Sequence, residues 1–266
     1  MTESSGSSKL AARLPPSFMR NLVTSIAGAS LSLLFPEACQ ICGSERADPA
    51  EGYVCRTCWS KPGSIQFIRA PYCHRCGLPY DGALTTEFVC ANCQDVKLHF
   101  SAARSATVAA GLVRETIHRF KYQRQLWFEP FLADLLLREM KPWLAESGRW
   151  DWLVPVPLHP QREREREFNQ SQRIATAVAR ATGIPCASQA LHRIRPTDTQ
   201  TALSRDQRAA NMRKAFAIGG RFPLNGKRVI LIDDVLTTGA TTNACARVLR
   251  TAGAVDIFVW TVARGV

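Results

Sequence analysis

Two adjacent carboxylates, Asp233 and Asp234, stand between an apolar segment and a loop of small residues. The run that contains them reads VILIDDVLTTGAT over residues 229–241. Its branched apolar residues predict a buried strand, and a helical pattern follows the loop. Backbone N–H groups at a helix start favour a bound phosphate, and carboxylates can accept hydrogen bonds from a ribose diol or hold a hydrated Mg²⁺. The run therefore predicts a site for a phosphorylated sugar.

The structural alternative is an ordinary strand-to-helix turn whose acids cap the helix. All thirteen positions, however, resemble the phosphoribosyl pyrophosphate (PRPP) signature of type I phosphoribosyltransferases. The resemblance implies catalytic roles for Asp233 and Asp234, and Mg²⁺ bound together with PRPP. The PRPP-binding residues that it implies here are Asp233, Asp234, Val235, Leu236, Thr237, Thr238, Gly239, Ala240 and Thr241.

Eight of the ten cysteines form four Cys-x-x-Cys pairs. Such a pair points two thiolates at one ion, so four pairs predict two structural zinc ions. Disulfides are the alternative, but the phosphorylated-sugar site implies an intracellular substrate. The zinc pairing stays open, although the repeat-like halves 39–58 and 73–93 favour a sequential one. The predicted ligands are Cys39, Cys42, Cys55, Cys58, Cys73, Cys76, Cys90 and Cys93.

Strand-like and helical segments alternate from about residue 100, which predicts an α/β fold with a mostly parallel sheet and flanking helices. We expect three parts. Residues 1–35 form a disordered or helical extension, 36–97 a small double zinc ribbon, and 98–266 a type I phosphoribosyltransferase-like domain. The apolar stretch 18–35 is short and interrupted by Ser and Gly, so we expect no membrane span.

An arginine-rich segment follows the strand predicted near residue 153. Residues 153–171 read LVPVPLHPQREREREFNQS. The prolines turn the chain out over the sheet edge, and the arginines match phosphate geometry. A solvated helix face is the alternative, because glutamates alternate with the arginines.

Together, PVPLHP, FNQS, LLFPEACQICG, the Lys121–Tyr122 pair and the PRPP signature resemble the ComF family. This family consists of competence-associated proteins with a phosphoribosyltransferase domain, and the resemblance extends over about residues 33–265. It implies a cytoplasmic protein that serves DNA uptake in natural transformation. Single-stranded DNA and proteins of the competence machinery are the implied partners.

The same resemblance makes Arg166, Asn169 and Gln170 candidate contacts of the pyrophosphate. Glu167 stands where the family usually has glycine. We expect this change to remove access to positive φ, and to make the pyrophosphate contact weaker than the 5′-phosphate contact. Lys121 ends a basic helix, where dipole compensation and a phosphate or nucleic-acid contact are equally good interpretations.

Residues 193–216 resemble the mobile lid of type I phosphoribosyltransferases, with a surface hairpin or loop as the alternative. The matching positions are Thr199, Gln200, Leu203, Arg208 and Asn211.

Three functions remain open at this level. The first is a PRPP-binding phosphoribosyltransferase-family protein that serves DNA uptake. The second is a non-catalytic single-stranded-DNA-binding module with PRPP as a regulatory ligand, and the third is a phosphoribosyltransferase of nucleobase salvage. A formal net charge of +12 suits polyanionic partners in either case. The zinc region is a DNA contact or a protein-docking unit. No segment of the sequence indicates a dedicated pocket for an acceptor base.

Overall fold

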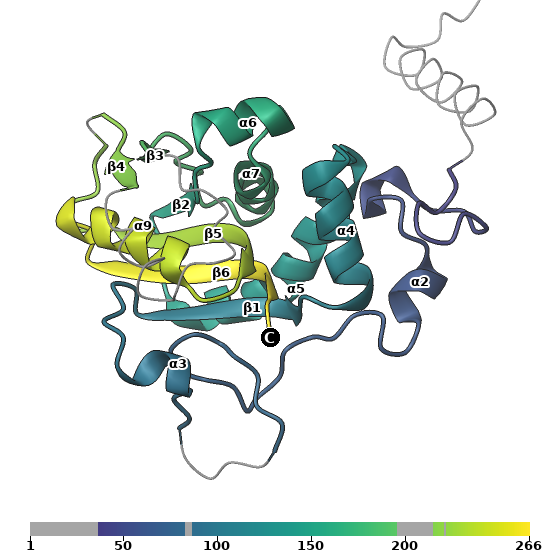
Figure 1. Ribbon diagram of the computed structural model, residues 1–266, viewed down its shortest axis with the longest axis horizontal. Helices are drawn as coiled ribbons and strands as arrows, with labels where there is room; N and C mark the ends of the chain where they lie inside the picture. Colours follow the sequence, from purple (N-terminus) through teal and green to yellow (C-terminus); the bar gives the residue numbers. More distant parts are fainter. Residues whose placement is uncertain (1–36, 83–86, 196–214, 221) are drawn as a thin grey trace, which may run out of the picture.

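A computed structural model describes residues 37–82, 87–195, 215–220 and 222–266. Its centre is a four-stranded parallel sheet in the order β1-β6-β5-β2, with helices on both faces (Figure 1). The strands are β1 (Ala102–Val108), β2 (Trp152–Pro155), β5 (Arg228–Leu236) and β6 (Asp256–Arg264). The α/β class and the mostly parallel sheet expected from the sequence are confirmed.

The alternation of side chains along β5 explains why the sheet needs cover on both faces. Ile230 and Ile232 belong to the core under α5 (Glu129–Ser147) and α7 (Gln170–Thr182). Val229 and Leu231 belong to the core under α9 (Ala240–Thr251). Helix α4 (Gly111–Tyr122) follows β1 and packs against α5.

Smaller elements surround the carboxyl edge of the sheet. Helix α6 (Pro160–Arg166) follows β2 and leads into α7. Strands β3 (Leu191–Arg193) and β4 (Phe216–Ile218) pair antiparallel in a separate two-stranded sheet. β3 lies at the start of a polar and charged stretch, where the sequence alone gives little indication of a strand. The lid positions between them fall within 196–214, outside the described residues.

Two small cysteine-rich ribbons precede the sheet, as the sequence predicts. The first contains η1 (Pro49–Glu51) and α2 (Arg56–Ser60), and the second contains α3 (Ala91–Gln94). The first lies against α4 and α5, where Trp59 contacts Phe131 edge-to-face at 4.8 Å between ring centroids. Arg119 also donates to the carbonyl of Gln40 at 2.7 Å. The short helix η2 (Leu126–Phe128) joins α4 to α5.

The second ribbon and the segment before it cover the outer edge of β1 (Figure 1). The Val108 N–H donates to the carbonyl of Gln66 at 2.8 Å, and the Ile68 N–H to that of Ala106 at 3.0 Å. Further along, the Ala103 N–H donates to the carbonyl of Arg75 at 2.9 Å. These bonds satisfy an edge that the sheet alone would leave open.

Gly77 shows how tightly the second ribbon is seated on this edge. It has φ +67°, and a Cβ atom there would lie 2.9 Å from the Ala103 carbonyl oxygen. A side chain at this position would therefore strain the Cys-x-x-Cys turn and push the ribbon off β1.

None of the helices in the described part of the chain combines the length and hydrophobicity needed to cross a lipid bilayer. The extension expected at residues 1–35 lies outside the described residues.

Candidate functional site

The acidic pair lies at the carboxyl end of β5, and both side chains are buried. Asp233 accepts hydrogen bonds from the Ser171 hydroxyl at 2.7 Å and from the Asp234 N–H at 2.9 Å. Asp234 accepts a hydrogen bond from the Gln170 amide at 3.3 Å and pairs with the Lys121 ammonium. The pair is thus held by the start of α7 on one side and the end of α4 on the other.

The two carboxyls differ in electrostatics. Burial, followed by the charge of Asp234, raises the pKa of Asp233 to about 7. Burial also acts on Asp234, but the Lys121 cation outweighs it and lowers the pKa of that carboxyl. Near neutral pH, Asp234 therefore carries a negative charge, and Asp233 holds a proton that it loses readily.

The loop after β5 begins with the exposed residues Thr237 and Thr238. Gly239 then starts α9 with φ 76° and ψ 3°, a left-handed conformation that glycine adopts without strain. Its carbonyl accepts a hydrogen bond from the Thr242 hydroxyl at 3.1 Å, which braces the loop. Because Gly239 provides no side-chain cap, the first turn of α9 presents backbone N–H groups to an incoming anion.

Four of the implied PRPP contacts have limited freedom. Val235 and Leu236 pack into the two cores, so only their backbones could meet a ligand. Asn169 caps α7 through its Oδ1 and donates to the carbonyl of Val156 at 3.1 Å. Gln170 accepts a hydrogen bond from Arg166 at 3.0 Å while donating to Asp234, so it links the arginine to the acidic pair.

The expectation about Glu167 is wrong in one respect. Glu167 adopts φ 68° and ψ −1° at the end of α6, so the glycine's conformation is retained without glycine. Arg124 binds the Glu167 carboxylate at 2.6 Å and the Glu165 carbonyl at 3.0 Å, which holds the turn in place.

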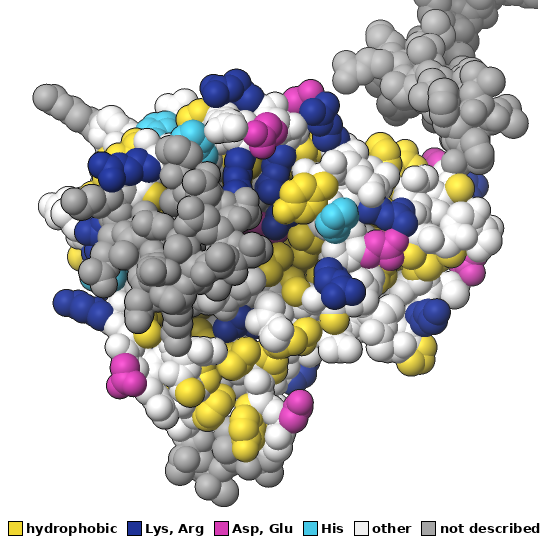
Figure 2. All heavy atoms as spheres, viewed as in Figure 1, with side chains coloured by type: hydrophobic (Ala, Val, Ile, Leu, Met, Phe, Trp, Pro, Cys, Tyr) yellow, Lys and Arg dark blue, Asp and Glu magenta, His cyan; other side chains and the backbone are white. Residues whose placement is uncertain are grey.

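Sequence reasoning underestimated Lys121 and did not single out Ser171. Lys121 lies at the basic end of α4, but its ammonium is mostly buried against Asp234 instead of compensating the helix dipole in solvent. Ser171 lies in the FNQS motif, which was the available signal. Figure 2 shows Lys and Arg side chains gathered around a hollow between α6 and α4.

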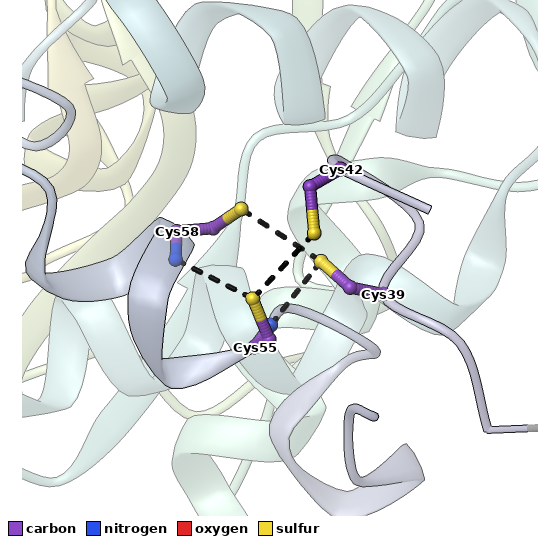
Figure 3. A group of neighbouring side chains, drawn as sticks. All are labelled: Cys39, Cys42, Cys55 and Cys58. Atoms are coloured by element: carbon purple, nitrogen blue, oxygen red, sulfur yellow. Dashed lines mark hydrogen bonds between the residues drawn. The ribbon is translucent and has the colours of Figure 1, made fainter. Parts of the chain in front are cut away.

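The eight paired cysteines form two sequential groups, and within each group the sulfur atoms lie within 4.8 Å of one another. The sulfurs of Cys39 and Cys58 are 3.8 Å apart, as are those of Cys42 and Cys55 (Figure 3). A tetrahedral ion with Zn–S bonds of about 2.3 Å spaces its sulfurs by about 3.8 Å. In the second group, Cys76 and Cys90 are 3.6 Å apart. Both groups therefore fit structural zinc ions.

Arg264 joins the second cysteine group to the loop after β5. This buried guanidinium donates to the carbonyls of Leu236 and Thr237 at 2.8 and 2.5 Å. Its other terminal nitrogen lies 3.8 Å from the sulfur of Cys76. Residues 237–241 are called the anion loop below. The backbone at the start of this loop is thus fixed by Arg264, the same side chain that touches a predicted zinc ligand.

The chain is similar to solved amidotransferase structures over part of its length. Glutamine phosphoribosylpyrophosphate amidotransferase from B. subtilis, complexed with ADP and GMP, matches with 27% identity and a TM-score of 0.32. The match covers 48% of this chain and 24% of the amidotransferase chain, about a quarter of its length.

Residues 30–94 match the double zinc ribbon domain family. Competence protein F of Haemophilus influenzae is 36% identical over 56% of this chain and 66% of that protein, just under two thirds of its length. Competence protein ComFC of Bacillus subtilis is 28% identical over 74% of this chain and 77% of its own. DNA utilization protein YhgH of Salmonella typhimurium is 31% identical over 74% of this chain and 85% of that protein. With a double zinc ribbon before the parallel sheet and relatives of this kind along most of its length, the chain belongs to the ComF family.

Proposed function

We propose that this protein binds PRPP with Mg²⁺ at the end of β5 and serves DNA uptake in the cytoplasm. The observation that carries the proposal is a buried, hydrogen-bonded carboxylate pair directly followed by a glycine-started helix. Carboxylates, loop N–H groups and a nearby arginine are the groups that a doubly phosphorylated ribose requires. The role in DNA uptake is supported by relatives named as competence and DNA utilization proteins.

Each group has a distinct task in the proposed complex. The N–H groups of 237–241 hold the 5′-phosphate, and Asp233 and Asp234 accept hydrogen bonds from the ribose hydroxyls. Arg166 neutralises charge on the pyrophosphate. The carboxylate oxygens of Asp233 and Asp234 fit Mg²⁺, which would neutralise charge on the pyrophosphate.

We propose phosphoribosyl transfer as the reaction at this site. The bond between C1 and the pyrophosphate oxygen breaks, pyrophosphate leaves with the electron pair, and a nitrogen of the acceptor bonds to C1 and releases its proton to solvent. The protein contributes by positioning the two ends of the sugar and stabilising separated charge. In this proposal the two carboxylates stabilise the positive charge that develops on the ribose.

Calorimetric titration with PRPP and Mg²⁺ tests the binding proposal. The wild-type chain is expected to bind, and the double variant Asp233→Asn with Asp234→Asn is expected to lose binding. Asp134→Asn is the matched control, because it removes a half-exposed carboxylate on α5. Affinity of the double variant equal to that of the wild-type chain would refute the assignment.

A second candidate is a non-catalytic single-stranded-DNA-binding module regulated by PRPP. It is favoured by the exposed ring of Tyr122, which contacts the His118 ring in a tilted geometry at 4.9 Å between centroids and lies under the Arg166 guanidinium at 4.9 Å. Exposed rings among cations suit stacked bases. Gel-shift assays with single-stranded DNA, with and without PRPP and Mg²⁺, decide this candidate. Pyrophosphate release with a defined acceptor would favour transfer instead.

A further inference from the structure

A cavity of about 850 Å³ lies between the second ribbon and the loop after β5. Residues 66–71 and 78–81 of the ribbon side form one wall. The opposite wall includes Thr237 and Thr238 of the anion loop, together with Arg264 at the end of β6. The cavity thus adjoins the loop proposed to hold the 5′-phosphate, and its volume is in the range of small-molecule sites.

The ribbon wall has an apolar and partly aromatic part with Phe67, Pro71 and Tyr80, and it also includes the polar residues Gln66, Arg69 and Asp81. Figure 2 shows hydrophobic side chains gathered over this part of the molecule, below the chain's C-terminus. The Tyr80 side chain is 41% exposed, and its ring is held from one side by Phe88 at 4.9 Å between centroids. The Tyr80 N–H also donates to the carbonyl of Pro71 at 3.1 Å. An accessible ring that is supported on one side is a stacking surface for another ring.

Polar side chains on both walls suit the rim of a base. Asp81 and Asn92 add a carboxylate and an amide to the cavity, and the two threonines add hydroxyl groups. A nucleobase has apolar faces and a rim of hydrogen-bond donors and acceptors, which is the pattern that these walls match. The wall opposite the ribbon is also rigid, because its Arg264 guanidinium is fixed by backbone carbonyls.

We propose that this cavity binds a planar heteroaromatic ring of nucleobase size, stacked on Tyr80. The ring belongs to a free base or to an unstacked base of single-stranded DNA. The proposal rests on the proposed function in one respect, because the cavity shares Thr237 and Thr238 with the loop assigned to the 5′-phosphate. The cavity lining includes none of the residues assigned to the ribose hydroxyls or the pyrophosphate, so the ring site adjoins the 5′-phosphate end of the sugar and lies apart from C1. The second ribbon then forms part of a ligand site as well as a zinc-stabilised fold.

The test uses 2-aminopurine, whose fluorescence falls when it stacks. The full-length zinc-loaded chain is titrated against free 2-aminopurine, and separately against a decathymidine strand with one internal 2-aminopurine, both without PRPP. The wild-type chain is expected to quench at least one probe. Tyr80→Ala should weaken that binding about tenfold, while Tyr80→Phe keeps it. Trp127→Ala, which removes a ring of similar exposure far from the cavity, should bind as the wild-type chain does.

Zinc content and thermal unfolding of each variant show that the ribbon is intact. Quenching of the free base alone identifies a small-molecule ligand, and quenching of the strand alone identifies a base in DNA. The proposal is overturned if neither probe binds, or if Tyr80→Ala binds as tightly as the wild-type chain. Parallel PRPP titrations keep the two proposals separate. PRPP binding without ring binding overturns only the proposal for the cavity. Ring binding without PRPP binding overturns only the proposal for the sugar-phosphate site.

Discussion

Asp233 and Asp234 are chemically identical residues that their neighbours make different. Asp233 faces the Ser171 hydroxyl and lies beside a like charge, whereas Asp234 faces the Lys121 ammonium. A buried pair of this kind ionises in two steps, and the first negative charge belongs to the carboxyl nearest the cation. This asymmetry leads to two predictions at the residue scale.

The first prediction concerns pH. The folded-state pKa of Asp233 is raised from 3.8 to about 7, so the folded chain holds this proton more tightly than the unfolded chain. The resulting stabilisation is complete below the unfolded pKa and is lost as the pH rises toward 7. Between pH 5 and 7, wild-type stability should fall by about 2 kcal/mol relative to Asp233→Asn. Urea unfolding across this range checks it. Parallel pH profiles for the two proteins would contradict it.

The second prediction concerns Lys121. Lys121→Met should lower the free energy of unfolding by about 3 kcal/mol, because it leaves the Asp234 carboxylate buried without a cation. Added Mg²⁺ should recover part of that loss in the variant but have less effect on the wild-type chain. The matched control is Arg46→Met, which breaks a pair with Glu37 in which the arginine is largely exposed, and it should change stability by less than about 1 kcal/mol. Equal losses in the two variants would show that Lys121 has no special role.

At the scale of elements, the connection between α6 and α7 determines how Arg166 approaches the acidic pair. The turn requires a left-handed residue, and Glu167 takes that conformation despite its side chain. Asn169 then caps α7, so that Gln170 and Ser171 reach the two carboxylates from its first turn. The turn is thus strained at Glu167 and well hydrogen-bonded at Asn169.

Glu167→Gly should therefore raise the free energy of unfolding by up to about 1 kcal/mol, since glycine relieves the left-handed strain. The ion pair that it removes is largely exposed on both sides and contributes little. Glu167→Ala is the control, because it loses the ion pair and keeps the strain. If both variants destabilise the protein equally, the pair with Arg124 outweighs the strain. Chemical unfolding of the three proteins provides the measurement.

Local patterns were predictable, and contacts between distant segments were not. The strand, acidic pair and loop of 229–241 are one continuous run, so the sequence predicts both its structure and its place at the sheet edge. The helix closed by Gly183 was predictable for the same reason. The partnership of Lys121 with Asp234, and the pairing of β3 with β4, join segments far apart in the chain. The cavity beside Tyr80 also depends on how the second ribbon docks, which no single segment encodes.

At the scale of the whole molecule, the two zinc sites have unequal positions. The first ribbon packs on α4 and α5 through Trp59. In the second ribbon, Cys76 lies next to Arg264, which fixes the carbonyls at the start of the anion loop. A disturbance at the second site therefore has a direct route to the proposed PRPP site.

Cys42→Ser and Cys76→Ser form a matched pair, because each alters the second cysteine of the first Cys-x-x-Cys pair of its own ribbon. Each variant should lose about one zinc ion per chain. Cys76→Ser should weaken PRPP binding by about 1 kcal/mol, whereas Cys42→Ser should leave it nearly unchanged. Zinc analysis with PRPP calorimetry on both variants measures this difference. Equal affinities would show that Arg264 does not transmit the change.

The backbone bonds along the outer side of β1 have a practical consequence. A fragment beginning near residue 98 would keep every strand of the parallel sheet and yet lose the segment that hydrogen-bonds to Ala106 and Val108. Its bare strand would offer open N–H and C=O groups to a second molecule, and self-association would follow. The second ribbon and the segment before it thus cover the edge strand, and cutting the chain at this boundary would expose that strand.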